Sequence, residues 1–242
     1  MSDLSKLREL VALSCRILGK LNLTKEPSGH VSARIPGEEK ILIKARGPDE
    51  SGLRFVTARD VITVDFAGKK IAGDDGLESP QEVFIHTWLY KTRPDVQCVV
   101  HIHPLTVMLF TICNKPLQPL YGAYDPSGLR LLVDGLATYP RSVTVSDNKL
   151  GEEFAQTMGN KQACLMRGHG ITSAGPSVEE ATLTAIKLND AAVINYQASL
   201  LGNPQPISQE DIDVTVGKSV GRTQRVHTAS GWRYYRKLLD ED

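Results

Sequence analysis

The sequence predicts an α/β fold in which helices and strands form one layered sandwich. Helix-start signals alternate along the chain with short apolar segments of strand length. This mixed order of the two element types indicates a sandwich built around a central sheet. The 242 residues, 41% of them hydrophobic and 23% charged, suit one compact domain with a full-sized core.

The first part of the chain is predicted to fold as a helix followed by three strands. Apolar residues recur at helical spacing over residues 4–20, and Gly19 marks the expected end. Strands are expected at residues 31–35, 40–44 and 61–66. Ser79 and Glu82 then form a capping-box pattern around Pro80, which predicts a helix running towards Arg93.

From about residue 98 to residue 201, strands and helices are predicted to alternate more regularly than in the first part. The apolar segment that contains His101 and His103 is expected to be a strand, and Pro104 opens a short helix reaching Ile112. A helix is expected over residues 147–158, with strands at 163–167 and 171–173 around a Gly-His-Gly loop. Ser177 begins a second capping box, which predicts a long helix to about residue 201.

Composition argues against several partners. The 28 basic and 28 acidic residues cancel, and no basic cluster is dense enough to follow a phosphate backbone, so no nucleic acid is expected. The apolar stretch 98–113 is interrupted by two histidines and a proline, and the N-terminus lacks a cleavable signal, so no membrane partner is expected. The four cysteines are widely spaced and are expected to be reduced. The expectation is a cytoplasmic protein that acts on a small molecule.

The most specific chemical signal is the pair His101 and His103. On a strand, residues two apart point to the same face, so both imidazoles can reach one metal ion. His169 lies between two glycines, which let the backbone approach a ligand closely. Three neutral imidazoles with an open fourth position are typical of catalytic zinc-type sites. The alternative for each histidine is a hydrogen-bonded core residue.

Glu82 also has two interpretations. A capping-box role would explain it fully, whereas its functional role would be to ligate the metal or to move protons. His86, one helical turn later, is expected to support the site or to pack.

In order along the chain, these residues resemble the class II aldolase/adducin family over residues 4–200. The resemblance is carried by the motifs Ser28-Gly29-His30-Val31-Ser32, Glu82, Arg93-Pro94-Asp95, Val99-Val100-His101-Ile102-His103 and Gly168-His169-Gly170. It implies that His101, His103 and His169 bind one divalent metal ion per subunit, of zinc, manganese, cobalt or iron type, with Glu82 as a further ligand and acid/base.

The resemblance also implies the architecture and the assembly. Residues 1–242 would form a single α/β/α sandwich around a mainly antiparallel central sheet, with 203–242 as a C-terminal extension that could pack at a subunit interface. Family members are commonly homotetramers with active sites near these interfaces, so a homo-oligomer is expected. In the tail, Trp232, Tyr234 and Tyr235 alternate with basic residues, and Tyr121 and Tyr124 are possible pocket residues.

Departures from the family pattern indicate the substrate. Sugar-phosphate members hold phosphate with an asparagine, a threonine-glycine turn and two serines, where this chain has His30, Arg46-Gly47 and Pro80-Gln81. Losing these hydroxyls argues against a phosphorylated sugar. Arg46 offers a planar fork suited to a carboxylate, with Lys44 two residues earlier. Ser28, Gly29 and Gly47 complete the expected substrate-binding set, and His30 is expected to contact the substrate as a catalytic residue.

This set resembles the decarboxylase branch of the family, which acts on hydroxylated aromatic or pyridine carboxylates. The predicted function is a metal-dependent carbon–carbon lyase that decarboxylates such a compound. A retro-aldolase acting on an unphosphorylated hydroxy acid or sugar is the first alternative. A non-haem iron oxygenase and a metal-free interaction module, as in the adducin head domain, are further alternatives.

Overall fold

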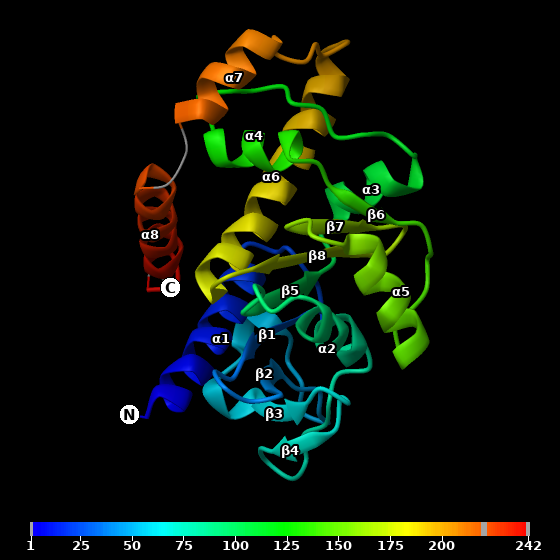
Figure 1. The fold of residues 1–242 in the computed structure, drawn as a ribbon, viewed down its shortest axis with the longest axis vertical. Helices are drawn as coiled ribbons and strands as arrows, with labels where there is room; N and C mark the ends of the chain where they lie inside the picture. Colours follow the sequence, from blue (N-terminus) through cyan, green and yellow to red (C-terminus); the bar gives the residue numbers. More distant parts are fainter. Residues whose placement is uncertain (1, 219–221, 241–242) are drawn as a thin grey trace.

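The structure is a computed structural model that describes residues 2–218 and 222–240. Within these residues, eight strands form one sheet in the order β4-β3-β2-β1-β5-β8-β7-β6 (Figure 1). The strands are β1 (His30–Arg34), β2 (Lys40–Lys44), β3 (Val61–Asp65), β4 (Lys70–Ala72), β5 (Cys98–Ile102), β6 (Ala137–Tyr139), β7 (Ala163–Met166) and β8 (Gly170–Gly175).

The sheet is mainly antiparallel, as the family resemblance implied. Antiparallel pairs connect β4 through to β7, whereas β6 and β7 run parallel at one edge. Strand β5 lies between β1 and β8, so the predicted metal-binding strand is central and paired on both sides. This position fixes its backbone more firmly than an edge strand would be fixed.

Helices cover both faces of the sheet and make it the middle layer of a sandwich. The helices are α1 (Asp3–Lys20), α2 (Val83–Thr92), α3 (Leu105–Ile112), α4 (Pro126–Val133), α5 (Asn148–Met158), α6 (Val178–Leu201), α7 (Gln209–Lys218) and α8 (Arg222–Lys237). Short 3-10 helices η1 (Leu53–Phe55) and η2 (Ala58–Asp60) lie before β3. In Figure 1, α2 and α5 lie together on one side, and α1 and α6 lie on the other.

Two apolar clusters, one on each face of the sheet, form the core. The cluster beneath α1 and α6 includes Val31, Leu42 and Val100 of three neighbouring strands. The cluster beneath α2 and α5 includes Ile43 and Val99, which point to the opposite face. Alternation along each strand therefore sends successive side chains into different cores, as expected for a sheet buried on both faces.

Several predicted elements are confirmed to within a residue or two. The first helix, the three early strands and the short helix after Pro104 match α1, β1, β2, β3 and α3. Asp147 and Ser177 are N-caps whose side chains accept the backbone N–H of Leu150 and of Glu180. The helix that Ser177 starts does end at Leu201. At Asp147 and Ser177 the polar N-cap was therefore a correct local signal.

The predicted capping box at Ser79 is wrong. Helix α2 begins later, at Val83, and Glu82 occupies its N-cap position without a side-chain capping bond. The Ser79 hydroxyl instead donates to the carbonyl oxygen of Gly68, at 2.8 Å. The pattern failed because both side chains have tertiary partners that replace the local capping contacts.

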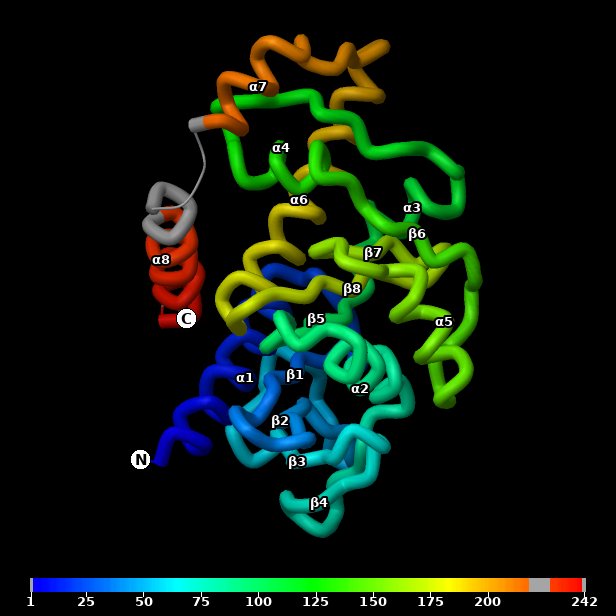
Figure 2. The backbone as a smooth tube through the Cα atoms, viewed as in Figure 1, coloured from blue at the N-terminus to red at the C-terminus, as the bar shows by residue number. Residues whose placement is uncertain are grey.

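The C-terminal extension folds back onto its own chain. Helix α8 lies beside α6 and α1 (Figure 2), and Trp232 is 7% exposed within the cluster on that face. This placement explains the alternation of aromatic and basic residues in the tail as an amphipathic helix. A contact between residues 203–242 and another subunit stays a prediction.

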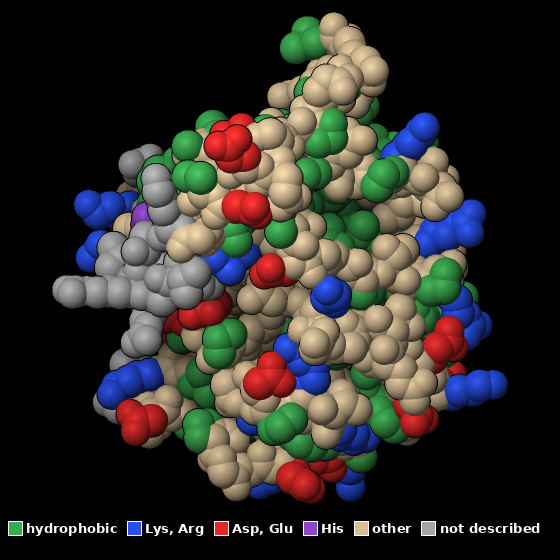
Figure 3. All heavy atoms as spheres, turned by 45° about the horizontal axis from the view of Figure 1, so that its top comes forward, with side chains coloured by type: hydrophobic (Ala, Val, Ile, Leu, Met, Phe, Trp, Pro, Cys, Tyr) green, Lys and Arg blue, Asp and Glu red, His purple; other side chains and the backbone are tan. Residues whose placement is uncertain are grey.

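The cysteines and the surface agree with their sequence-based description. Cys15, Cys98, Cys113 and Cys164 are all free, and all but Cys113 are buried. On the face drawn in Figure 3, acidic and basic side chains are interspersed. In the described part of the chain, no helix combines the length and the apolar character needed to cross a membrane.

Candidate metal and substrate site

Four predicted side chains converge at the end of the central strands. Glu82, His101, His103 and His169 each offer one ligand atom, and these atoms all lie within 4.8 Å of one another. The Nε2 atoms of His101 and His103 are 2.9 Å apart. Glu82 Oε2 lies 3.4 Å from His101 Nε2 and 3.3 Å from His169 Nε2. The cluster joins the start of α2, the end of β5 and the loop before β8.

The sheet orients His101 within this cluster. His101 pairs across the strands with His30 on β1 and with Thr172 on β8. Its Nδ1 lies 3.2 Å from Thr172 Oγ1, a contact that leaves Nε2 for the cluster. A hydrogen bond to the remote ring nitrogen is the usual way in which a protein fixes the tautomer and direction of a histidine ligand.

Two glycines give His169 its position. Gly168 has a φ of +61°, which allows a turn closed by a 3.1 Å bond from the His169 N–H to the Met166 carbonyl. A Cβ on Gly170 would collide with the carbonyl oxygen of Ile102. Glycine at position 170 therefore lets the loop approach β5 closely enough for His169 to meet the other imidazoles.

Glu82 is held by its other oxygen. The backbone N–H of Val145 donates to Glu82 Oε1 at 2.9 Å, and Oε2 faces the imidazoles. Burial alone would raise the pKa of Glu82, but His101 and His169 lower it well below its ordinary range through their hydrogen bonds and through their charge when they are protonated. The group is therefore a carboxylate at neutral pH and suited to bind a cation. Donating a proton to the substrate would need a pKa raised towards neutrality, and the metal-free site shifts the pKa of Glu82 in the opposite direction.

The cluster fits a divalent metal ion. A tetrahedral ion with bonds of about 2.0–2.2 Å to nitrogen and oxygen separates its ligand atoms by about 3.3 Å, and right-angled ligands by about 2.9 Å. The distances of 2.9, 3.3 and 3.4 Å between ligand atoms match these separations. Burial lowers the pKa of His103 to about 3, and burial also lowers the pKa of His101. Both imidazoles are thus neutral and able to ligate.

His30 lies beside the cluster on the neighbouring strand. Its ring stacks on that of His101, with centroids 5.1 Å apart, and only 7% of its surface is exposed. Its Nδ1 is 2.7 Å from Nε2 of His86, which is fully buried. Burial lowers the pKa of His30 well below 6.5 and that of His86 to about 3, so both rings are neutral.

The loop before β1 also reaches the cluster. Gly29 has a φ of +85°, and a Cβ there would lie 3.1 Å from the carbonyl oxygen of His101. Glycine is therefore required for this close approach. Ser28 makes a local turn in which its hydroxyl donates to the carbonyl of Lys25 at 2.5 Å.

Two other predicted substrate-binding residues, Lys44 and Gly47, line a cavity next to the β2–β3 end of the sheet. Lys44 is 3% exposed, forms an ion pair with Glu50, and points to the α1 face of the sheet, because Ile43 beside it points to the α2 face. Burial lowers its pKa to about 8. Lys44 and Gly47 line a cavity of about 370 Å³ that includes none of the four clustered side chains.

Arg46 is exposed and paired. Its guanidinium donates to Glu78 Oε2 at 2.8 Å, and the two backbones form an isolated antiparallel bridge. With half of its side chain accessible, Arg46 is free to exchange this partner for another carboxylate.

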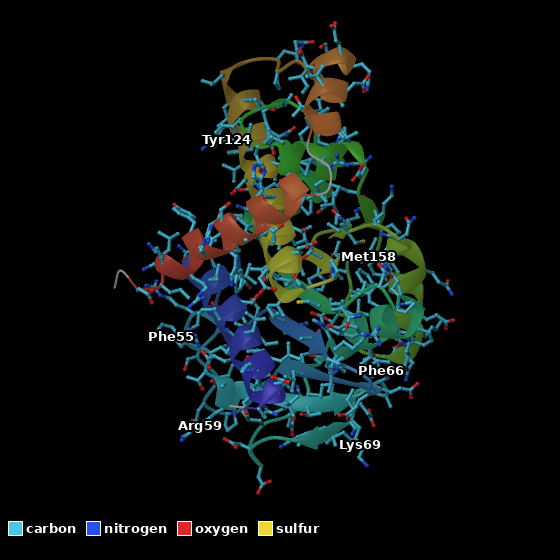
Figure 4. The ribbon with its side chains drawn as sticks, turned by 60° about the vertical axis from the view of Figure 1, so that its left-hand side comes forward. Phe55, Arg59, Phe66, Lys69, Tyr124 and Met158 are labelled. Carbon is cyan, nitrogen blue, oxygen red and sulfur yellow. The ribbon has the colours of Figure 1, made fainter. Side chains whose placement is uncertain are left out.

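The aromatic residues singled out beyond the metal strand occupy another region. Tyr124 lines a cavity of about 620 Å³ together with Tyr234 and Tyr235 of α8. Figure 4 shows Tyr124 beside α6, towards the α7 end of the molecule. Tyr121, in ring contact with Tyr124, is 8% exposed. The structure does not bring these tyrosines to the clustered histidines of the same chain.

Sequence reasoning missed the groups that hold the site residues in place. Val145 acts through its backbone N–H, which leaves no trace in a sequence pattern. Thr172 could have been found, because it follows the Gly-His-Gly loop on a strand adjacent to His101. Ser32 and Tyr90 extend the contact between His30 and His86, and depend on how α2 packs on β1.

Comparisons with known proteins agree with this geometry. The chain is 37% identical over 230 residues to the 3,4-dihydroxyphthalate decarboxylase of Arthrobacter keyseri, covering 94% of this chain and 91% of that protein. It is 40% identical over 200 residues to the enzyme of the same name from Terrabacter sp. strain DBF63, covering 82% and 83%.

Solved structures show the same fold at lower identity. An aldolase II superfamily protein from Pseudomonas syringae superposes with a TM-score of 0.85 at 23% identity, covering 99% of this chain and 94% of that one. The L-fuculose 1-phosphate aldolase of Glaciozyma antarctica gives 0.81 at 20% identity, covering 98% and 89%. Residues 9–196 match the family model of the class II aldolase and adducin N-terminal domain, and the chain therefore belongs to that family.

Proposed function

We propose that the protein is a metal-dependent carboxy-lyase that removes carbon dioxide from a hydroxylated aromatic or heteroaromatic dicarboxylate, a step of aromatic compound catabolism. The observation that carries the proposal is the convergence of three imidazoles and one carboxylate at a single point. The similarity to two 3,4-dihydroxyphthalate decarboxylases over more than four fifths of the chain supports decarboxylation in particular.

His101, His103 and His169 would hold one divalent ion per subunit, with Glu82 as a further ligand. The bound ion would supply Lewis acidity that stabilises negative charge on a substrate oxygen. Imidazole and carboxylate donors suit zinc, manganese, cobalt or iron, and the donor set fits each of them.

Glu82 would move the proton that the reaction requires. Glu82 is ionised at neutral pH and its Oε2 faces the imidazoles, so its position allows it to accept the hydroxyl proton of a substrate bound there. When carbon dioxide leaves, the electron pair of the broken carbon–carbon bond stays on the ring carbon, and Glu82 returns the proton to that carbon. Carbon dioxide leaves as a neutral molecule and the hydroxyl proton ends on the ring carbon, so the product is left as a phenolate that takes up one proton from solvent. Val145 holds the Glu82 carboxylate in place throughout.

His30 and Arg46 would hold a carboxylate of the substrate. His30 is a neutral ring next to His101, with its Nε2 left free by the contact between Nδ1 and His86. Arg46 could exchange Glu78 for the substrate and bind it through two parallel hydrogen bonds. Ser28, Gly29 and Gly47 shape the two loops, and Lys44 supports the Arg46 loop through Glu50.

A substrate without phosphate is favoured by the residues before Glu82. Pro80 is buried and Gln81 is exposed, so neither provides the hydroxyl groups with which the sugar-phosphate members hold phosphate. Retro-aldol cleavage would use the same metal and the same proton carrier, and product analysis separates the two reactions.

The test is a substrate panel. Protein loaded in separate samples with Zn²⁺, Mn²⁺, Co²⁺ or Fe²⁺ is incubated with hydroxylated phthalates and hydroxypyridine dicarboxylates, and carbon dioxide and the ring product are measured. Equal amounts of carbon dioxide and monocarboxylate are expected. Release of an aldehyde would instead identify a retro-aldolase, and consumption of dioxygen an iron oxygenase.

A second copy of the chain would close the open side of the cluster. On α3, directly after His103 and Pro104, Leu105 is 58% exposed and Ile112 is 50% exposed. Ile112 Cγ2 lies 3.5 Å from a Cβ built on Gly168, so this apolar surface adjoins the His169 loop. Burying such residues favours association, and we propose a homotetramer of single-domain subunits, residues 1–242, with sites near the interfaces.

A further inference from the structure

Four buried polar side chains form a continuous chain behind the candidate site. His30 Nδ1 is 2.7 Å from His86 Nε2, and His86 Nδ1 is 2.7 Å from Ser32 Oγ. Ser32 Oγ is 2.8 Å from the Tyr90 hydroxyl. The exposed fractions of these residues are 7% for His30, 2% for Tyr90 and 0% for the other two.

The secondary structure places these residues in matching pairs. His30 and Ser32 are two apart on β1 and point to the same face of the sheet. His86 and Tyr90 are four apart on α2 and lie on one face of that helix. Because α2 packs on the β1 side of the sheet, the two pairs interleave, and each contact is between the strand and the helix.

Tyr90, the last of these four side chains, determines the direction in which the hydrogen bonds between them run. Among the described residues, Ser32 Oγ is the side-chain partner of the Tyr90 hydroxyl, and the backbone of Val99 acts on this hydroxyl as a hydrogen-bond donor, which leaves Ser32 as the acceptor for the Tyr90 proton. A buried hydroxyl donates its proton where an acceptor is available, since an unmade bond costs free energy. Tyr90 therefore donates to Ser32, and Ser32, with one proton, donates to His86 Nδ1.

The donor and acceptor roles of both imidazoles follow from this direction. A neutral imidazole has one N–H, so His86, which accepts at Nδ1, carries its proton on Nε2 and donates to His30 Nδ1. By the same reasoning His30 carries its proton on Nε2. In the opposite direction His30 Nε2 would be an acceptor, and the buried Tyr90 proton would have no acceptor among the described residues.

We propose that His86, Ser32 and Tyr90 are positioning residues that hold His30 as its Nε2–H tautomer. His30 thereby presents a fixed hydrogen-bond donor next to His101. This donor selects a ligand that places an acceptor oxygen there, such as a carboxylate or carbonyl oxygen, and disfavours a ligand that offers only an N–H. The identity of that oxygen as a substrate carboxylate rests on the proposed function, whereas the tautomer does not.

The primary test reads the tautomer without turnover. In ¹⁵N spectra of histidine-labelled, Zn²⁺-loaded protein, the His30 signal is assigned by its loss in His30→Asn. We expect the Nε2–H tautomer for both His30 and His86. Observation of His30 as the Nδ1–H tautomer would overturn the proposal, whether or not the protein proves to be a decarboxylase.

The second test removes the terminal donor. Tyr90→Phe keeps the shape of the ring and deletes the hydroxyl, so His30 should shift towards the Nδ1–H tautomer. With 3,4-dihydroxyphthalate as the probe, KM should rise by about tenfold with a smaller change in kcat, which is the size of one lost hydrogen bond to a charged group. The matched control is Tyr139→Phe, which deletes a hydroxyl from another fully buried tyrosine on the same side of the sheet.

The outcomes separate a positioning role from a general packing role. Equal effects of Tyr90→Phe and Tyr139→Phe on the His30 spectrum, or an unchanged His30 tautomer in Tyr90→Phe, would contradict the proposal. If the tautomer shifts as expected while no decarboxylation is detected in wild-type protein, the proposed function fails and the positioning role stands.

Discussion

Glu82 and Val145 are joined by a hydrogen bond of 2.9 Å, in which the backbone N–H of Val145 donates to Oε1 of the carboxylate. Val145 is fully buried in the segment between β6 and α5, so this donor is fixed by the core. The bond leaves Oε2 facing His101 and His169. One oxygen of Glu82 therefore sets its position while the other is free for chemistry.

Glu82→Gln should separate metal binding from turnover. The amide oxygen can still accept the Val145 N–H, and three imidazoles remain, so the metal should be retained. The amide cannot accept and return a proton, so kcat should fall by about 10²–10⁴-fold. Turnover and metal content are measured on the same preparation.

The matched control for this variant is Glu153→Gln. Glu153 forms a surface ion pair with Arg141, at 2.7 Å, and lies outside the cluster. Its replacement should leave turnover unchanged. Near-normal turnover in Glu82→Gln would remove Glu82 from the proposed mechanism.

His103→Ala should lose the metal itself. It deletes one of three imidazole ligands at the end of β5, and affinity should fall by at least about tenfold. Elemental analysis after dialysis measures the metal content per chain. The control is His227→Ala on α8, an exposed histidine outside the cluster. Full metal occupancy in His103→Ala would contradict the ligand set.

Leu105→Glu should weaken self-association. A charge placed in the apolar surface next to the cluster would have to be buried in the proposed interface, at a large desolvation cost. Light scattering coupled to gel filtration should show a smaller particle than for wild type. Phe55→Glu is the control, because Phe55 is also exposed, at 62%, and Figure 4 places it near α1 and η2. A wild-type monomer would contradict the assembly proposal directly.

Acid should destabilise the metal-free protein through His86. Burial lowers its folded pKa from 6.5 to about 3, so between these values the unfolded chain binds a proton that the folded chain does not. The free energy of unfolding therefore falls as pH falls through this window, at up to about 1.4 kcal/mol per pH unit for this proton.

Urea denaturation at about pH 7.5 and about pH 5 measures this dependence. His86→Gln removes one titrating group and should reduce the decline in stability between the two conditions. The comparison uses the difference between pH values, so a general loss of stability in the variant does not affect it. Equal declines in wild type and variant would show that His86 is not neutral in the folded protein.

The predictable part of the fold is the part governed by local chemistry. Asp147 and Ser177 predicted the starts of α5 and α6 correctly because an N-cap side chain bonds to a backbone N–H within three residues. Strands β4 and β6 have only three residues each, too few to show a period, and both were missed. Helix α4 was also missed, although Asp125 as N-cap and Pro126 at the first position are a recognisable start.

The candidate site was predictable where strand geometry places the side chains. His101 and His103 follow from the two-residue repeat of β5, and the glycines beside His169 indicated a close approach. The two-residue repeat of β2 also fixes the direction of Lys44. No local pattern, however, showed which face of the sheet carries the histidines. The role of Tyr90 depends on the packing of α2 against β1, which no local pattern encodes.

Gly29, before β1, and Gly170, at the start of β8, set how closely the two neighbouring segments approach β5. A side chain at Gly29 would crowd the carbonyl of His101, and one at Gly170 would collide with that of Ile102. A side chain at either position would push β1 or the His169 loop away from β5 and so change the spacing of the imidazoles. The backbone spacing of the site is thus set by two residues that have no side chain and offer no metal-ligand atom.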